Sequence, residues 1–237
     1  MLRIEHLTKT YGGKKAVDDL SLHIRAGEIY GFIGHNGAGK TTTIKSCCGI
    51  LQFEEGEIYV DGVSIRVDPI GCKRKIAYLP DNPDLYEFLS GVQYLNFIAD
   101  VYGVSKEERE RRIKEYADLF GLTEDLAQPI SAYSHGMKQK VAIISALVHE
   151  PKLLVLDEPF VGLDPKAALD LKNIMKELCR QGSAIFFSTH VLEVAQKLCN
   201  KIAIIKDGKL VTSGNMEEVV KNQSLEDIFM EVTTDDK

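Results

Sequence analysis

The stretch GHNGAGKT, at Gly34–Thr41, constrains the fold of this chain more than any other feature. It fits the pattern G-x-x-x-x-G-K-[ST], in which glycines let the backbone wrap around a phosphate with its N–H groups pointing inward. The apolar run EIYGFIG leads into this loop. Ile44, Cys47 and Cys48 then follow at the i, i+3, i+4 spacing of a helix. We therefore predict a strand, a phosphate-binding loop and a helix, in that order.

The residues around this loop suit a magnesium nucleotide. Lys40 is expected to reach the β and γ phosphates, and the Thr41 hydroxyl to hold Mg²⁺. Asp157 ends the apolar strand LLVLD, where P-loop enzymes place an Asp that helps to hold the metal. Glu158 comes next and can polarise an attacking water as a general base. The simpler interpretations are a Gly-rich turn and two carboxylates that only cap a strand end.

The order of elements predicts an α/β fold. Strands alternate with helices over most of the chain, which indicates a mainly parallel sheet. Asp-Gly pairs at 61–62 and 207–208 lie between strand-like runs and predict hairpins. From about 86 to 150 the pattern is mostly helical, and Ser105 and Glu108 form a capping box within it. We therefore expect the sheet to be interrupted by a helical insert.

Composition narrows the classes of partner. The formal net charge of −6 disfavours a nucleic-acid binder, which needs a basic face to neutralise phosphates. Five scattered cysteines without CxxC spacing suggest free thiols in a reducing cytosol. No apolar run approaches the ~18 to 20 residues that span a bilayer, so we expect no embedded segment.

Five ordered motifs (GHNGAGKT, YSHGMKQK, LLVLDEP, GLDP and STH) resemble the ATP-binding subunit of a bacterial ABC transporter. The resemblance implies a P-loop NTPase core of the RecA-like kind, with an N-terminal antiparallel β subdomain and an inserted α-helical subdomain. It implies a single ABC ATPase domain over 1–237, with the core and β subdomain at 1–85 and 151–237 and the helical subdomain at 86–150. The acidic residue after YLP and the ending SLEDIFMEVT resemble ABC-2-type exporter ATPases, which move peptides, antibiotics or lipids.

In this family two ATPase subunits, identical or different, form a head-to-tail dimer. The motif YSHGM stands where the family carries its signature motif, so the resemblance places Ser134 and Gly136 on the γ-phosphate of the partner's ATP. It makes Asp164 the D-loop residue, and both Asp164 and Ser134 are also expected to act as helix N-caps. It makes His190 the switch histidine that contacts the γ-phosphate and Glu158, and it places Tyr11 on the adenine.

The expected site residues all contact ATP or Mg²⁺. They comprise the catalytic groups Glu158, His190 and Lys40, the metal ligands Thr41, Asp157 and Asp81, and the nucleotide ligands Tyr11, Asn36, Gly37, Ala38, Gly39, Lys40, Thr41, Thr42, Ser134, Gly136 and Asp164. Two positions depart from the family pattern. His135 replaces a glycine, and we interpret it as a solvated side chain. Asp81 replaces a glutamine, and we hypothesise that it couples ATP binding to the helical insert.

Aromatic residues crowd the start of the helical insert. They are Tyr86, Phe88, Tyr94, Phe97 and Tyr102. The resemblance implies that a groove for the coupling helix of a transmembrane subunit lies there. The simpler role for most of these residues is packing within the helical insert itself. We therefore expect a separate transmembrane permease subunit as partner. The chain would then lie in the cytoplasm, peripheral to the inner face of the cell membrane.

Three alternatives stay open at this point. Import is the opposite direction of transport. A soluble ABC-type ATPase that acts on DNA or ribosomes usually carries long coiled coils or two cassettes, and this chain shows neither. A P-loop kinase or GTPase would not need the YSHGM motif.

Overall fold

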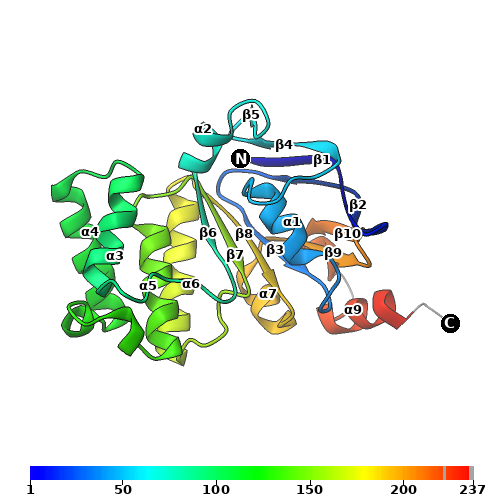
Figure 1. Ribbon diagram of the computed structural model, residues 1–237. Helices are drawn as coiled ribbons and strands as arrows, with labels where there is room; N and C mark the ends of the chain where they lie inside the picture. The colour runs from blue at the N-terminus through cyan, green and yellow to red at the C-terminus, as the bar shows by residue number, and fades with distance from the viewer. Residues whose placement is uncertain (221–222, 235–237) are drawn as a thin grey trace.

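The computed structural model describes residues 1–220 and 223–234; positions 221–222 and 235–237 of the domain predicted over 1–237 lie outside the described residues. Two sheets pack together, and helices cover the larger one (Figure 1). The larger sheet has the order β10-β9-β3-β8-β7-β6. Its strands are β3 (Ile29–Ile33), β6 (Ile76–Leu79), β7 (Leu153–Asp157), β8 (Ala184–Thr189), β9 (Lys201–Lys206) and β10 (Lys209–Asn215).

All pairings in the larger sheet are parallel except that of β10 with β9, which form the hairpin predicted at 207–208. The smaller sheet is antiparallel and has the order β2-β1-β4-β5. It comprises β1 (Leu2–Tyr11), β2 (Lys14–Ile24), β4 (Glu55–Val60) and β5 (Val63–Ser64). The predicted mainly parallel sheet, the N-terminal antiparallel sheet and the hairpin at 61–62 are therefore confirmed.

The predicted helical regions are helical in the structure. The phosphate-binding loop leads into α1, and the region predicted to be helical holds α3, α4 and α5 on one side of the molecule (Figure 1). Their bounds are α1 (Lys40–Cys47), α2 (Pro69–Arg74), α3 (Gly91–Val101), α4 (Lys106–Phe120), α5 (His135–Leu147), α6 (Pro165–Arg180), α7 (Leu192–Leu198), α8 (Met216–Val219) and α9 (Leu225–Thr234). Ser105 caps α4 as predicted, because its hydroxyl accepts the N–H of Glu108. The capping box is only half formed, however, since the Glu108 carboxylate accepts from the Ser105 hydroxyl and not from its backbone N–H. The subdomain boundaries at 86 and 150 remain a prediction.

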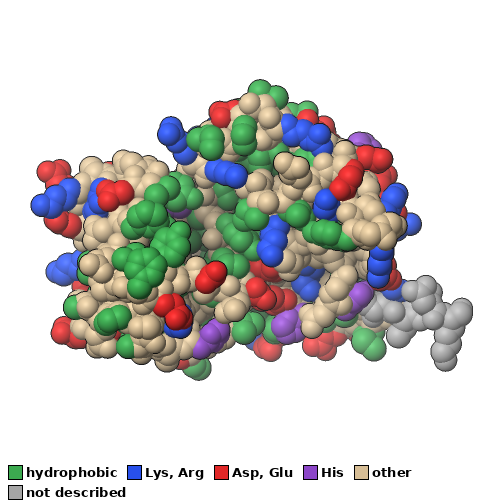
Figure 2. Space-filling model, in the orientation of Figure 1, with side chains coloured by type: hydrophobic (Ala, Val, Ile, Leu, Met, Phe, Trp, Pro, Cys, Tyr) green, Lys and Arg blue, Asp and Glu red, His purple; other side chains and the backbone are tan. Residues whose placement is uncertain are grey.

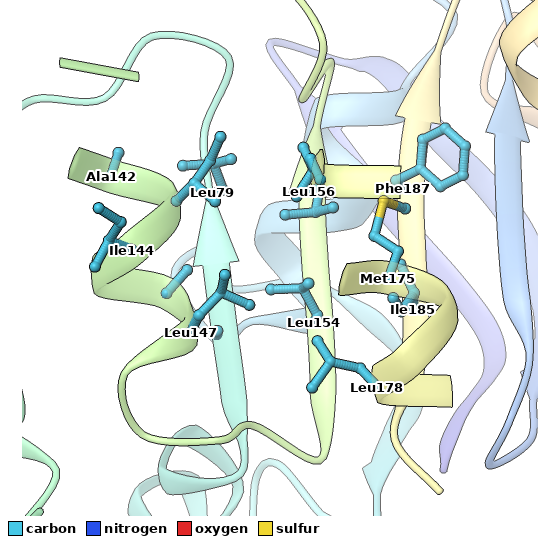
Figure 3. Packing of buried hydrophobic residues seen from close by; sticks show 14 of the residues in the cluster. Leu79, Ala142, Ile144, Leu147, Leu154, Leu156, Met175, Leu178, Ile185 and Phe187 are labelled. Atoms are coloured by element: carbon cyan, nitrogen blue, oxygen red, sulfur yellow. The ribbon is translucent and has the colours of Figure 1, made fainter. Parts of the chain in front are cut away.

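The larger sheet is buried on both faces, which explains its continuous apolar strands. In β7, Leu154 and Leu156 point toward α5 and α6, where they meet Ile144, Leu147, Met175 and Leu178 (Figure 3). The alternate residues Leu153 and Val155 belong to a second core, shared with α1 and the antiparallel sheet. Among the described residues, no helix has both the length and the apolar character needed to cross a membrane.

The strand order sets the position of the functional residues. β8 lies between β3 and β7, and the three strands are parallel. Their carboxyl ends therefore meet at one edge of the sheet, where α/β folds bind ligands. The phosphate-binding loop directly follows β3, Asp157 is the last residue of β7, and His190 directly follows β8.

Candidate functional site

The phosphate-binding loop has the backbone that its glycines allow. Gly37 and Gly39 adopt φ of 83° and 108°, in the left-handed region that favours glycine. A Cβ on Gly39 would also lie 2.4 Å from the carbonyl oxygen of Ala16, so no side chain fits there. The hairpin turn between β9 and β10 is hydrogen-bonded to the loop, since the N–H of Gly208 donates to the carbonyl of Ala38 over 2.9 Å.

This loop borders a cavity of about 220 Å³. The cavity gathers most of the predicted ligands, since its lining residues are Ala16, Asn36, Gly37, Gly39, Lys40, Thr41, Thr42, Asp81, Asp157 and Glu158. Ala38 is fully buried behind the loop and contributes its backbone only. The predicted ligands Tyr11, Ser134, Gly136 and Asp164, and the predicted catalytic His190, do not line the cavity.

Lys40 is buried and points toward the cavity. Its Nζ donates to the carbonyls of Gly34, over 2.7 Å, and His35, over 3.2 Å. Nζ also lies 3.9 Å from Oε1 of Glu158. Burial lowers the pKa of Lys40, against the opposing effect of the nearby carboxylates of Glu158 and Asp157. A cation held by two carbonyls in a buried place can exchange them for the oxygens of a phosphate.

Thr41 and Asp157 form the predicted metal pair. The Thr41 hydroxyl donates to Oδ2 of Asp157 over 2.7 Å, and Asp157 is almost fully buried. Asp81 lines the same cavity, and its Oδ1 accepts the N–H of Asn82. These hard oxygen donors suit Mg²⁺, which usually binds one or two carboxylates and completes its shell with phosphates and water. Among the described residues there is no group of three or more His, Cys, Asp or Glu side chains that could hold a metal ion.

Glu158 has an uncommon backbone for a residue with a side chain. Its φ is 48°, in the left-handed region. Its Oε1 lies 2.9 Å from Nδ1 of His190, and its side chain is 15% exposed whereas that of His190 is 53% exposed. The histidine therefore stands at the mouth of the site and contacts the carboxylate, as expected from the sequence.

The sequence did not single out Ser188. It is fully buried on β8, where its hydroxyl donates to Oδ1 of Asp157 and accepts the N–H of Glu158. Ser188 belongs to the STH motif, and its position two residues before His190 is the sequence feature that could have indicated a role in the site.

The start of α5 stands apart from the cavity. Ser134 is its exposed N-cap, and the hydroxyl accepts the N–H of Met137 over 3.3 Å. The His135 side chain is exposed, as expected, but it also packs against Gly162: its Nε2 lies 2.7 Å from where a Cβ on that glycine would be. The first turn of α5 therefore contacts the loop that follows Glu158.

Asp164 caps α6, as predicted, by accepting the N–H of Ala167 over 2.8 Å. It also pairs with Nζ of Lys140 on α5 at 2.8 Å. The hydrogen bond from Lys140 is the main cause of the lowered pKa of Asp164. Tyr11 is half exposed near the end of β1, with Nζ of Lys9 at 5.2 Å from its ring centroid.

The aromatic residues of the helical region divide into two groups. Tyr94 and Tyr102 pack against the core. Tyr86, Phe88 and Phe97 are exposed, and Tyr86 contacts the other two, with ring centroids 5.9 Å apart for Tyr86 and Phe88 and 5.7 Å apart for Tyr86 and Phe97. Figure 2 shows hydrophobic side chains gathered on the face formed by the helical region. We call these three residues the aromatic cluster.

Comparisons with known proteins agree with this geometry. The family described as ABC transporter matches residues 17–161. Over 220 residues the chain is 39% identical to the uncharacterized ABC transporter ATP-binding protein YhcH of Bacillus subtilis, covering 92% of this chain and 71% of that protein. It is 35% identical to the linearmycin resistance ATP-binding protein LnrL of the same organism, covering 92% and 70%. A solved structure of the ATP binding subunit of an ABC transporter, 34% identical, matches with a TM-score of 0.95 over 99% of this chain and all of that one. The P-loop NTPase fold is thereby confirmed.

Proposed function

The chain belongs to the ABC transporter family of ATP-binding proteins, and from this premise we propose that it hydrolyses ATP to drive an exporter through a separate transmembrane permease. It is an ATPase of the ABC type. The observation that carries the proposal is the convergence of Lys40, Thr41, Asp157 and Glu158 on one cavity at the carboxyl edge of the parallel sheet.

The chain's own residues bind and orient the nucleotide. Lys40 exchanges the carbonyls of Gly34 and His35 for phosphate oxygens, while the N–H groups of residues 36–39 and the start of α1 surround the phosphates. Thr41, Asp157 and Asp81 would hold Mg²⁺, and Thr42 lines the same cavity. When bound, the metal neutralises charge on the phosphates. Tyr11, exposed at the end of β1, stacks on the adenine.

Glu158 acts as the general base. Its carboxylate faces the cavity and accepts a proton from the attacking water, whereas His190 holds the same carboxylate at the mouth of the site. The arrangement supports hydrolysis because the base is fixed on a turn that directly follows the metal-binding Asp157.

A second copy, or a related ATPase subunit, completes the site. Ser134 and Gly136 do not line the cavity of their own chain, yet Ser134 is exposed at a helix start whose first N–H groups lack partners within the helix. In a head-to-tail dimer they contact the γ-phosphate bound by the partner, and Asp164 lies at the same interface. The helical subdomain is then 86–150, and it moves relative to the core at 1–85 and 151–237.

The membrane partner docks on the aromatic cluster. Exposed aromatic residues in mutual contact are common anchors of protein interfaces. Docking there places the chain at the inner face of the cell membrane, in the cytoplasm. Export is the direction we propose, because the name of LnrL is that of a resistance protein. We propose no nucleic-acid partner, because the formal net charge of −6 disfavours binding to phosphate backbones.

The test is the solution mass of Glu158→Gln with and without Mg-ATP. We expect a monomer that becomes a dimer only with Mg-ATP, since the amide cannot accept the proton and ATP stays bound. Lys40→Ala is the control and is expected to stay monomeric, because it lacks the cation that holds the phosphates. Normal ATP turnover by Glu158→Gln would contradict its role as the base. Co-purification of the wild-type chain with ribosomes or DNA would contradict the transport function.

A further inference from the structure

Ser188 makes a direct link between the two acidic residues of the site. It lies opposite Asp157 in the parallel pairing of β8 with β7. Its Oγ is 2.5 Å from Oδ1 of Asp157 and 3.1 Å from the backbone nitrogen of Glu158. Ser188 is completely buried, so water does not compete for these bonds.

The direction of each hydrogen bond follows from chemistry. A backbone N–H can only donate, so the hydroxyl accepts from Glu158. Its single proton is then free for Oδ1 of Asp157. The other carboxylate oxygen, Oδ2, accepts from Thr41. Both oxygens of Asp157 are therefore held, one from β8 and one from α1, which fixes the plane of the carboxylate.

The second bond of Ser188 restrains the backbone of Glu158. A residue with a side chain holds a left-handed φ such as the 48° of Glu158 only when its surroundings enforce it. The bond from its N–H to Ser188 is one such restraint. This backbone directs the carboxylate toward His190, 2.9 Å away, and Lys40, 3.9 Å away.

We propose that Ser188 is a positioning residue for ATP hydrolysis, whose hydroxyl fixes the metal-binding carboxylate of Asp157 and the backbone of the base Glu158 relative to each other. The inference rests on the roles proposed above for those two residues. Without the hydroxyl, the buried Oδ1 of Asp157 and the partly buried N–H of Glu158 each lose a hydrogen-bond partner. The carboxylate can then rotate away from the metal position, and the base can leave its left-handed conformation.

The test compares Ser188→Ala with Ser188→Thr, which keeps a hydroxyl. The control is Ser46→Ala, because Ser46 is also fully buried but its hydroxyl donates only to the carbonyl of Thr42 within α1. Four quantities are measured: the affinity for a fluorescent ATP analogue in EDTA and in Mg²⁺, kcat for ATP, KM for ATP, and the thermal midpoint without nucleotide.

We expect Ser188→Ala to bind the analogue in EDTA as the wild type does, but to lose most of the gain in affinity that Mg²⁺ brings. Its kcat should fall by about ten- to a hundredfold, the range for a lost hydrogen bond to a charged group. Ser188→Thr should restore both quantities, and Ser46→Ala should leave them unchanged. These results would separate positioning from stability, since both alanine variants lose a buried serine.

The inference is overturned if Ser188→Ala keeps its Mg²⁺ dependence and its kcat, or if its kcat falls only in proportion to a lowered thermal midpoint, as a purely structural role requires. It is also overturned if Ser188→Thr folds but does not rescue Ser188→Ala. A different result would contradict the proposed function itself. In that case Glu158→Gln would hydrolyse ATP at the normal rate, whichever residue is present at position 188.

Discussion

Nδ1 of His190 lies 2.9 Å from Oε1 of Glu158, although 32 positions separate the two residues in the chain. They meet because β7 and β8 are neighbours in the parallel sheet and each strand ends just before one of them. Nζ of Lys40 lies 3.9 Å from the same carboxylate oxygen. The proposed base thus stands between an imidazole ring and a buried lysine.

His190→Ala should lower kcat by about a hundredfold, within the range for loss of acid–base assistance, because Glu158 loses the contact that holds it at the mouth of the site. ATP affinity should change little, since the phosphate-binding loop is untouched. Phosphate release and nucleotide titration measure the two quantities. His6→Ala is the matched control, because His6 also pairs with a carboxylate, that of Asp19, but on an exposed surface. Equal turnover in both variants would remove His190 from the mechanism.

Asp81→Ala should reduce Mg-dependent hydrolysis while ATP binding in EDTA is retained, because Asp81 borders the cavity beside Thr41 and Asp157. Asp81→Gln, which installs the residue expected from the family, should keep more activity than the alanine variant. Stimulation of hydrolysis by the reconstituted permease measures coupling. If Asp81→Ala hydrolysed ATP normally and responded normally to the permease, the proposed metal and coupling roles would both be wrong.

Gly162→Ala should destabilise the fold through two effects that can be separated. Its φ of 79° is left-handed, which costs a residue with a side chain about 1–2 kcal/mol. In addition, its Cβ would lie 2.6 Å from Cδ2 of His135. Urea unfolding should therefore show a smaller cost in a His135→Ala background.

Gly121→Ala is the control for this pair. Gly121 also has a left-handed φ, of 66°, but no heavy atom lies within 4 Å of its added Cβ. Its cost should be the same with His135 or Ala at 135. If the cost of Gly162→Ala were also the same with His135 or Ala at 135, the contact between His135 of α5 and the loop that contains Gly162 would contribute nothing to stability.

Acid should destabilise the chain partly through His149. Burial, the largest cause, lowers the pKa of His149 to about 4 from 6.5, and its ring stacks on Tyr102 at 3.6 Å between centroids. The unfolded chain binds a proton at this residue below pH 6.5, whereas the folded chain does so only near pH 4. Stability from this group is therefore present above pH 6.5 and is lost as the pH falls toward 4, up to about 3 kcal/mol.

His149→Gln removes the titrating group, so its free energy of unfolding should fall less between pH 7 and pH 4 than that of the wild type. Urea titrations at several pH values measure both slopes. A variant with the wild-type slope would assign the acid sensitivity to other groups.

Local patterns in the sequence were sufficient to predict those parts of the site that lie within a single turn or at the end of a single strand. The glycines of the phosphate-binding loop predict its left-handed backbone, and α1 begins at Lys40 with the apolar spacing that follows. Ser134 and Asp164 were expected as N-caps and act as such, because a cap depends only on the next three residues. The trans contacts assigned to these residues remain predictions.

Sheet order decided what the sequence left open. Ser188 holds Asp157 only because β8 pairs with β7 in a register that places the two opposite each other. In the same way, the packing of α3 leaves Tyr94 partly buried against the core but Phe97, three positions later on the same helix, exposed.

The sequence by itself therefore determined the phosphate-binding loop, the acidic strand end and the alternation of strands and helices, since each follows from backbone geometry over a few residues. The tertiary structure alone decided which side chains share a hydrogen bond across the site. That depends on the burial of two apolar faces of one sheet, which fixes strand order and register among segments distant in the chain.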